Sequence, residues 1–152
     1  MRKYLILFLS LFFISCNQDT PTSVNQNSDF SIIHLHSIKK TYTNYNEAFQ
    51  IAKKEKKVVF ILFTTDYCRW CTKLRETTLR NNKIIKNLNN DFIVLLLDKN
   101  HSQYPKSYKI KSVPSIYLTD KNEEVFTSII GYHKNPNDYL KWFEYIKVEL
   151  SN

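Results

Sequence analysis

The sequence predicts an α/β fold, a single-domain three-layer sandwich with a mixed central sheet. Two continuous apolar runs, residues 58–63 and 92–97, are typical of strands that are covered on both faces, as in a parallel sheet. A hairpin pattern over residues 115–119 and 125–130 follows them and indicates antiparallel pairing in the same sheet. Helical patterns separate and follow these strands, so helices are expected on the faces of the sheet.

The elements before the first apolar run are expected to be a strand and a helix. Residues 30–35 alternate in part between apolar and polar side chains, which predicts a strand. Asn44 or Asn46 is a suitable N-cap for a helix that runs to about residue 55. The apolar positions of this helix share one face: Ala48, Phe49 and Ala52.

Between the two apolar runs the chain is expected to be helical. A helix over residues 73–79 turns Leu74 and Thr78 inward, and a second, short helix starts at Asn82. The apolar positions of the second helix are Ile84, Ile85 and Leu88. Further along, residues 104–108 predict one helical turn.

The C-terminal part begins at Val113-Pro114, where the proline interrupts the chain before the hairpin. Residues 120–122 are the expected turn of the hairpin, and Gly131, the only glycine in the chain, ends its second strand. Residues 136–150 predict the last helix, with apolar side chains three or four positions apart: Tyr139, Phe143 and Ile146.

Residues 1–15 are typical of an export signal that is removed from the mature protein. Arg2 and Lys3 precede an apolar stretch that is shorter than the ~20 residues a membrane span needs. The stretch leads to Cys16 and resembles the cleavage site of bacterial lipoproteins, whose cysteine is acylated; an ordinary secretory signal is the alternative. We therefore expect a bacterial cell-envelope protein on the periplasmic side, lipid-anchored to the membrane through Cys16.

Residues 16–28 are polar and predict a flexible tether, so the folded domain is expected over residues 29–152. The formal net charge of +8 at pH 7 is spread over the chain, and no arginine-rich stripe is present. This distribution predicts a solvated basic surface that meets anionic head groups near the anchor, and it argues against a nucleic-acid partner.

Cys68 and Cys71 point to the chemistry of the chain. They are three positions apart, after a buried strand and at the start of a helix, which is the arrangement of a thiol–disulfide redox site. Three alternatives stay open, namely a structural disulfide, a zinc site and an inert pair. No second cysteine pair and no histidine at ligand spacing accompany these cysteines, so neither a metal nor an organic cofactor is expected. The four histidines are expected to be ordinary surface or core residues.

Residues 64–73, which contain an aromatic residue, the Cys-x-x-Cys pair and a lysine, resemble the active-site segment of the thioredoxin family. Val113-Pro114 before a strand and Gly131 before the last helix extend the likeness, which covers roughly residues 42–150. The exported, thioredoxin-related branch with periplasmic thiol:disulfide interchange domains is the most similar. The resemblance implies the thioredoxin fold.

The resemblance also implies roles for individual residues. Cys68 is the attacking nucleophile and Cys71 the resolving thiol. The bond before Pro114 is cis, and the backbone of Val113 pairs with the substrate. Stabilisation of the Cys68 thiolate at the helix N-terminus, with Arg69 adding positive charge, makes the disulfide more oxidising.

Three positions depart from the family pattern. Leu62 replaces a buried acid, Tyr67 replaces a tryptophan, and Arg69-Trp70 replace Gly-Pro between the cysteines. The missing acid predicts a slower or more specialised exchanger, because the resolving thiol lacks its usual proton acceptor. Tyr67, Arg69 and Trp70 are expected to bind substrate, and the alternative for the two aromatics is that they shield the disulfide.

We therefore expect an envelope thiol:disulfide oxidoreductase that reduces or exchanges disulfides of exported proteins, with electrons from a membrane thiol reductase. Two alternatives remain, a disulfide-forming oxidase or isomerase and a non-catalytic adaptor with the same fold. A reduction potential near −270 mV, about that of thioredoxin, favours reduction, and one of about −120 mV favours oxidation.

Overall fold

The computed structural model describes residues 34–151 of the chain. The expected signal sequence (residues 1–15), Cys16, the tether (16–28) and residues 29–33 lie outside the described residues. In chain order the elements are α1 (Tyr45–Glu55), β1 (Val58–Thr64), α2 (Arg69–Glu76), the short 3₁₀ helix η1 (Thr78–Arg80), α3 (Asn82–Asp91), β2 (Phe92–Asp98), β3 (Ser115–Thr119), β4 (Val125–Ile130) and α4 (Asn137–Ser151).

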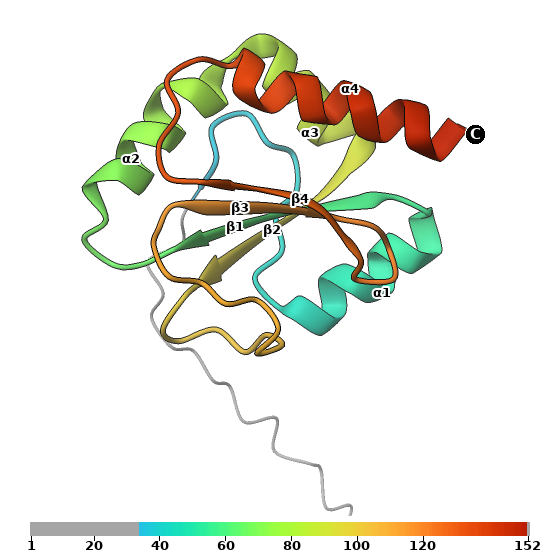
Figure 1. Cartoon of the computed structure of the whole chain (residues 1–152), viewed down its shortest axis with the longest axis horizontal. Coiled ribbons are helices and arrows are strands. Elements are labelled where there is room, and N and C mark those ends of the chain that lie inside the picture. The colour runs from blue at the N-terminus through green and yellow to red at the C-terminus, as the bar shows by residue number, and fades with distance from the viewer. Residues whose placement is uncertain (1–33, 152) are drawn as a thin grey trace, which may run out of the picture.

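The strands form one mixed sheet in the order β2-β1-β3-β4 (Figure 1). β1 and β2 are parallel, with Val58 beside Phe92 and Thr64 beside Asp98. β3 runs antiparallel to β1, and β4 runs antiparallel to β3. One end of the sheet therefore contains the C-terminal ends of β1 and β2 together with the N-terminal start of β3.

Helices cover both faces of the sheet and make three layers, with α2, α3 and α4 on one side and α1 on the other (Figure 1). Alternate residues of β1 explain this arrangement. Phe60 and Leu62 belong to the apolar cluster of α2, α3 and α4, and Ile61 and Phe63 belong to the cluster of α1. Every residue of β1 and β2 is buried, which confirms that both apolar runs are strands covered on both faces. The predicted fold class is confirmed.

Local sequence signals set several element ends. The Asn44 side chain caps α1 by accepting a hydrogen bond from the Glu47 amide at 3.0 Å. The Asn81 side chain caps α3 in the same way. Gly131 follows β4 with φ +88°, a conformation that favours glycine, and its amide donates to the Pro114 carbonyl at 2.8 Å. The hairpin of β3 and β4 and the helix α4 are confirmed as predicted.

Three predicted elements differ in the structure. The described part of the expected first strand, His34 and Leu35, is not in a strand; instead Tyr42 forms an isolated parallel bridge with Leu95 of β2. The helix that follows the cysteines ends at Glu76, before residue 79. There the Lys73 carbonyl accepts from the Thr77 hydroxyl at 2.6 Å as well as from the Thr77 amide, a side-chain bond of the kind that competes with regular helix bonding.

Residues 104–108 form no helical turn, which corrects the third prediction. The segment between β2 and β3 is irregular, and a hydrogen bond from the Tyr108 amide to the Pro105 carbonyl at 3.1 Å closes a single turn there. Its aromatic rings pack on Phe63 instead, with the Tyr104 ring at 4.9 Å and the Tyr108 ring at 5.7 Å. These contacts cover the part of the sheet that α1 leaves open. Within residues 34–151, no helix combines the length and the apolar character needed to cross a bilayer.

Candidate active site

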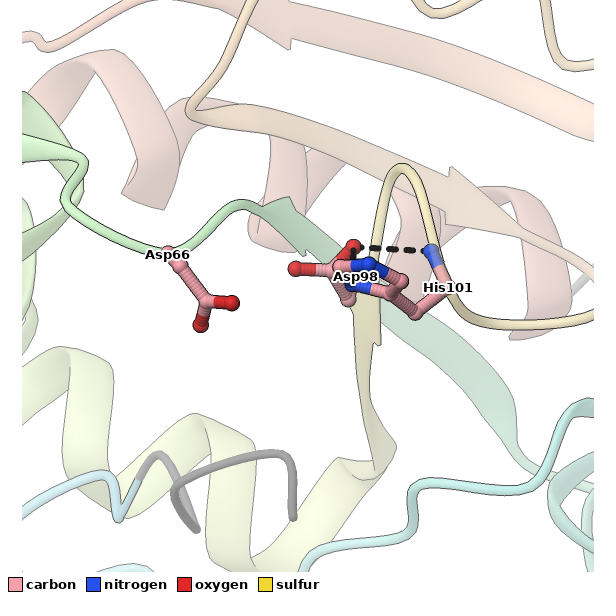
Figure 2. A group of neighbouring side chains, drawn as sticks. All are labelled: Asp66, Asp98 and His101. Atoms are coloured by element: carbon pink, nitrogen blue, oxygen red, sulfur yellow. Dashed lines mark hydrogen bonds and ion pairs between the residues drawn. The ribbon is translucent and has the colours of Figure 1, made fainter. Parts of the chain in front are cut away.

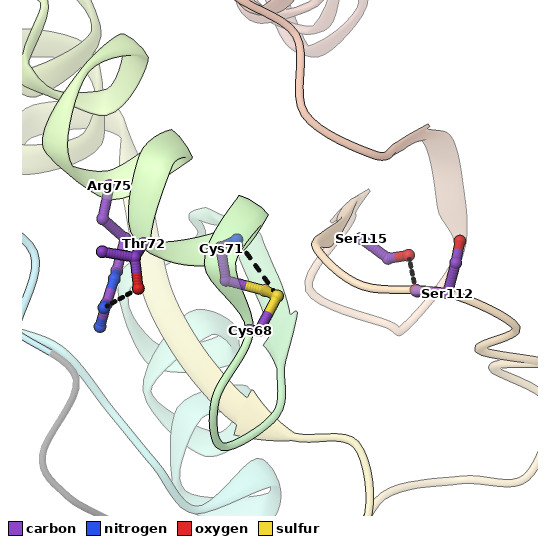
Figure 3. Close-up of a disulfide and its surroundings, with 6 residues drawn as sticks. All are labelled: Cys68, Cys71, Thr72, Arg75, Ser112 and Ser115. Carbon is purple, nitrogen blue, oxygen red and sulfur yellow. Dashed lines mark hydrogen bonds between the residues drawn. A yellow bond between two sulfur atoms is a disulfide. The ribbon is translucent and has the colours of Figure 1, made fainter.

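Cys68 and Cys71 form a disulfide at the start of α2 (Figure 3). Cys68 is the N-cap residue of the helix, and its Sγ accepts a hydrogen bond from the Cys71 amide at 3.1 Å. Cys71 is buried, with 3% of its surface exposed, whereas Cys68 is half-buried. The site therefore offers one sulfur to solvent and holds it against the positive end of a helix.

The loop between β1 and α2 carries the cysteines at the sheet edge. Asp66 and Tyr67 form an exposed turn, in which Tyr67 has a left-handed backbone with φ 56°. The side chain of Tyr67 is fully exposed. This turn brings the chain from the buried end of β1 to the first residue of the helix within four residues.

Trp70 stacks on Tyr132, which follows β4, with 5.6 Å between ring centroids and 21° between ring planes. The Lys73 ammonium lies over both rings, at 5.1 Å from Trp70 and 5.2 Å from Tyr132, and the Arg69 guanidinium lies 5.8 Å from Trp70. Half of the Trp70 surface stays exposed. Beside the cysteines there is thus a flat aromatic surface with two positive charges. Tyr132 belongs to this surface and was not predicted from the sequence.

The peptide bond between Val113 and Pro114 is cis, as the sequence resemblance implied. Pro114 directly precedes Ser115, which pairs with Phe63 near the end of β1. The register therefore brings this segment to the edge of the sheet that carries the disulfide, and Figure 3 shows Ser112 and Ser115 on one side of the cysteines.

A family profile described as "Thioredoxin-like domain" matches residues 45–147, more than half of the chain and all of the site residues above. The chain belongs to the thioredoxin-like family. Its cysteine pair, the cis bond before Pro114 and the mixed sheet all lie within the matched region.

Solved structures share this thioredoxin-like fold. A thioredoxin from Thermus thermophilus superposes with a TM-score of 0.62 at 19% identity, over 74% of this chain and 89% of that one. A DsbH oxidoreductase superposes with a TM-score of 0.56 at 16% identity, over 72% of this chain and 85% of that one. At these identities the likeness shows the fold alone.

Among curated proteins, spermatogenesis-associated protein 20 is similar over 76 residues, half of this chain. The identity is 32% for the rat protein and 28% for the human one. The chain spans about a tenth of the length of these relatives.

Leu62 is fully buried in β1 on the α2 side of the sheet, among apolar neighbours. This is the position at which thioredoxins carry a buried acid according to the sequence resemblance. No carboxyl group is therefore available from Leu62 to take the proton of Cys71.

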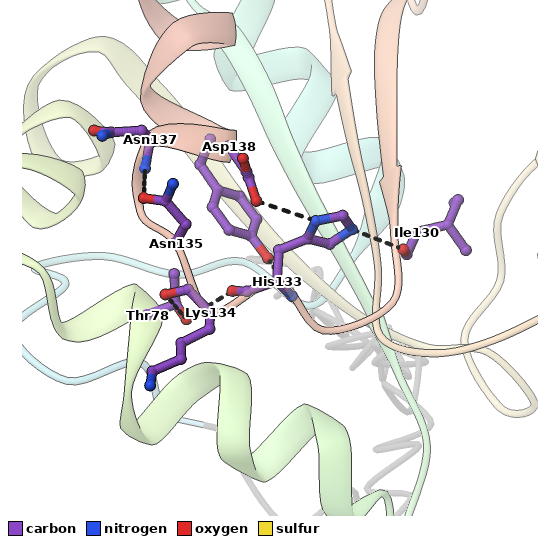
Figure 4. Close-up of polar contacts among 8 residues, drawn as sticks. Thr78, Ile130, His133, Lys134, Asn135, Asn137 and Asp138 are labelled. Atoms are coloured by element: carbon purple, nitrogen blue, oxygen red, sulfur yellow. Dashed lines mark hydrogen bonds and ion pairs between the residues drawn. The ribbon is translucent and has the colours of Figure 1, made fainter.

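A polar network joins η1, which follows the active-site helix α2, to the segment that precedes α4 (Figure 4). The buried hydroxyl of Thr78 lies 2.8 Å from the His133 carbonyl and 3.3 Å from the Lys134 carbonyl. The ring of His133 contacts Asp138 at 3.3 Å and the Ile130 carbonyl at 3.1 Å. His133 is thus a structural residue, in agreement with the expectation that the histidines are not ligands of the cysteine site.

Asp66, Asp98 and His101 form a second polar group, at the ends of β1 and β2 (Figure 2). One oxygen or nitrogen from each side chain lies within 4.8 Å of the others. Sequence reasoning missed this group because Asp66 and Asp98 are 32 positions apart, and only the parallel register of β1 and β2 brings them together.

Proposed function

We propose that the chain is a thiol:disulfide oxidoreductase that exchanges disulfides of other proteins through Cys68 and Cys71. The observation that carries the proposal is the asymmetry of the pair. Cys68 is partly exposed and caps α2, whereas Cys71 is buried one helical turn away. A thiolate at a helix N-terminus is favoured by backbone N–H groups, and a buried second thiol is suited to resolve a mixed disulfide.

In the reducing direction, the Cys68 thiolate attacks one sulfur of the substrate disulfide. A mixed disulfide forms, and the other substrate sulfur leaves as a thiolate that takes up a proton. The Cys71 thiol then loses its proton, attacks Sγ of Cys68 and releases the second substrate sulfur. Two electrons pass to the substrate, and the protein is left with the disulfide seen in the structure. A thiol partner, for which we propose a membrane thiol reductase, returns two electrons.

Substrate contacts come from the surface around Cys68. The backbone of Val113, before cis Pro114, pairs with an extended substrate segment. Trp70 and Arg69, with exposed Tyr67, contact its side chains. The half-exposed stack of Trp70 on Tyr132 supports this role, because exposed aromatic surface beside a reactive sulfur is typical of protein docking sites.

The protein acts in the bacterial cell envelope, on the periplasmic side, anchored through acylated Cys16. The export pattern of residues 1–15 and the polar segment 16–28 support this location. An oxidising compartment is also where a protein disulfide exchanger meets substrates.

Disulfide formation is the second candidate function. Arg69 next to Cys68 favours it, because positive charge stabilises the thiolate of the reduced state and so makes the disulfide a stronger oxidant. A reduction potential of about −120 mV, measured against glutathione, would favour the oxidase, and about −270 mV the reductase.

The experiment that tests the proposal is trapping with Cys71→Ser. This variant should accumulate mixed disulfides on Cys68 in cells, visible as higher-mass species on non-reducing gels that disappear with reductant. The matched control Cys68→Ser should form none, because the exposed attacking sulfur is absent.

Equal trapping by both variants would contradict the assigned roles, and no trapping by either would contradict exchange with proteins. A double variant, Cys68→Ser with Cys71→Ser, that keeps full cellular function would identify the chain as an adaptor.

A further inference from the structure

Asp98 ends β2 with a fully buried side chain, and one of its two carboxylate oxygens is unaccounted for. Oδ1 accepts hydrogen bonds from the amides of Asn100 at 2.7 Å and His101 at 2.9 Å, and it lies 3.1 Å from His101 Nδ1. Oδ2 is buried and has no hydrogen-bond partner within the described part of the chain. The turn after β2 therefore supplies hydrogen bonds to Oδ1 and none to Oδ2. A buried polar atom without a hydrogen bond is unfavourable and uncommon in folded proteins.

The surroundings of Asp98 offer little positive charge. Within residues 34–151, the only basic side chain at ion-pair distance is His101. The ammonium of neighbouring Lys99 is directed to the Lys111 carbonyl at 3.4 Å. Thr64, the register partner of Asp98 on β1, also has a buried hydroxyl oxygen without a partner. The adjacent strands β1 and β2 therefore each end at a residue with a buried oxygen atom that has no hydrogen-bond partner.

The free oxygen of Asp98 is directed toward a second carboxylate. Figure 2 shows it turned to Asp66, and the His101 ring lies directly beside the Asp98 carboxylate. Both Asp66 and His101 are exposed, so the group is closed by Asp98 on its inner side and open to solvent on its outer side. Two carboxylates and an imidazole converge here.

We propose that Asp66, Asp98 and His101 bind a divalent zinc ion. Carboxylate oxygens and an imidazole nitrogen are ligands of Zn²⁺, whereas Mg²⁺ and Ca²⁺ take oxygen ligands. Two ligand atoms at the usual Zn²⁺ distances stand ~3.3 Å apart in a tetrahedral site. His101 Nδ1 lies 3.1 Å from Oδ1 of the same carboxylate, so the imidazole stands beside Asp98, and Oδ2 is the oxygen left for the ion. Exposed Asp66 closes the remaining distance by a side-chain rotation, and water completes the shell.

The proposal uses neither cysteine and goes beyond the proposed function. Its physical consequence is a cross-link between the turn that precedes Cys68 and the loop that follows β2. An experiment can therefore contradict zinc binding without contradicting thiol exchange, and the reverse.

The test is isothermal titration calorimetry with zinc chloride on the full chain that carries Cys16→Ser and keeps the Cys68–Cys71 disulfide. This protein has no free thiol, because the chain contains three cysteines. We expect one Zn²⁺ per chain. His101→Gln and Asp66→Asn should each weaken binding at least tenfold, and both side chains are exposed, so the core is unchanged. The matched controls are exposed His36→Gln and Glu144→Gln, which should bind as the parent does.

Several results would overturn the assignment. They are no zinc binding by the parent protein, binding that Asp66→Asn and His101→Gln leave unchanged, or equal weakening by the two controls. Tighter binding of Mg²⁺ or Ca²⁺ than of Zn²⁺ under the same conditions would overturn the class of ion.

Discussion

Thr78 provides a direct test of how the active-site helix is fixed to the rest of the domain. Its hydroxyl is buried and lies 2.8 Å from the His133 carbonyl. Thr78→Val keeps the shape of the side chain and removes the donor, so that the partly buried His133 carbonyl loses its partner. Such a change costs about 1–3 kcal/mol of unfolding free energy. For a domain of this size, the melting temperature should fall by about 4–12 °C.

The measurement is urea denaturation of the oxidised protein, followed by far-UV circular dichroism without reductant so that the disulfide stays intact. Thr72→Val is the matched control, because it makes the same chemical change at an exposed hydroxyl of α2. The control should change stability by less than about 0.5 kcal/mol. If the two variants have the same unfolding free energy, the Thr78 contact does not hold the helix in place.

Two further predictions concern exposed and buried aromatic side chains. Trp70→Ala should slow exchange with a protein disulfide about 5- to 30-fold in a stopped-flow assay, as for loss of a docking residue, and leave the rate with glutathione disulfide unchanged. Tyr145→Ala on α4, equally exposed, is its control, and an equal effect of both would contradict docking at Trp70. Burial raises the pKa of Tyr139 to about 12. The ordinary pKa of a tyrosine is about 10, so between pH 10 and 12 the unfolded chain loses this proton while the folded protein keeps it. The unfolding free energy is therefore unaffected by Tyr139 below pH 10 and falls by about 2 kcal/mol as the pH rises toward 12. In Tyr139→Phe, the unfolding free energy from urea denaturation should fall less with pH over this range than in the parent. Exposed Tyr67→Phe is the control and should behave as the parent does. The same pH dependence in Tyr139→Phe and the parent would refute the argument.

The sheet could be predicted from the sequence because its signals are local. The runs 58–63 and 92–97 are apolar at every position, and a strand buried on both faces is expected to show that pattern at this length. The hairpin turn and the helix over residues 136–150 carry equally local signals. The cysteine pair was likewise placed correctly at the start of a helix, because it stands between a buried strand and a helical pattern in the sequence.

The parts that could not be predicted depend on contacts between distant residues. Tyr104 and Tyr108 have the spacing of one helical turn, but their rings pack on Phe63, and this burial decides the backbone. Trp70 meets Tyr132, 62 positions away, only because α2 and the end of β4 lie on the same side of the molecule. Neither contact has a signature in a short stretch of sequence.

The irregular segment between β2 and β3 connects two places of chemical interest. It begins beside Asp98 and His101, and it ends at Val113 and Pro114, where an incoming peptide would lie. It has no regular helix, and it is held by tyrosine rings packed on the sheet and by local hydrogen bonds such as that from the Tyr104 hydroxyl to the Lys99 carbonyl at 2.7 Å. The ion proposed at Asp98 and His101 would thus lie at one end of a single segment, and the backbone proposed to pair with substrate lies at its other end.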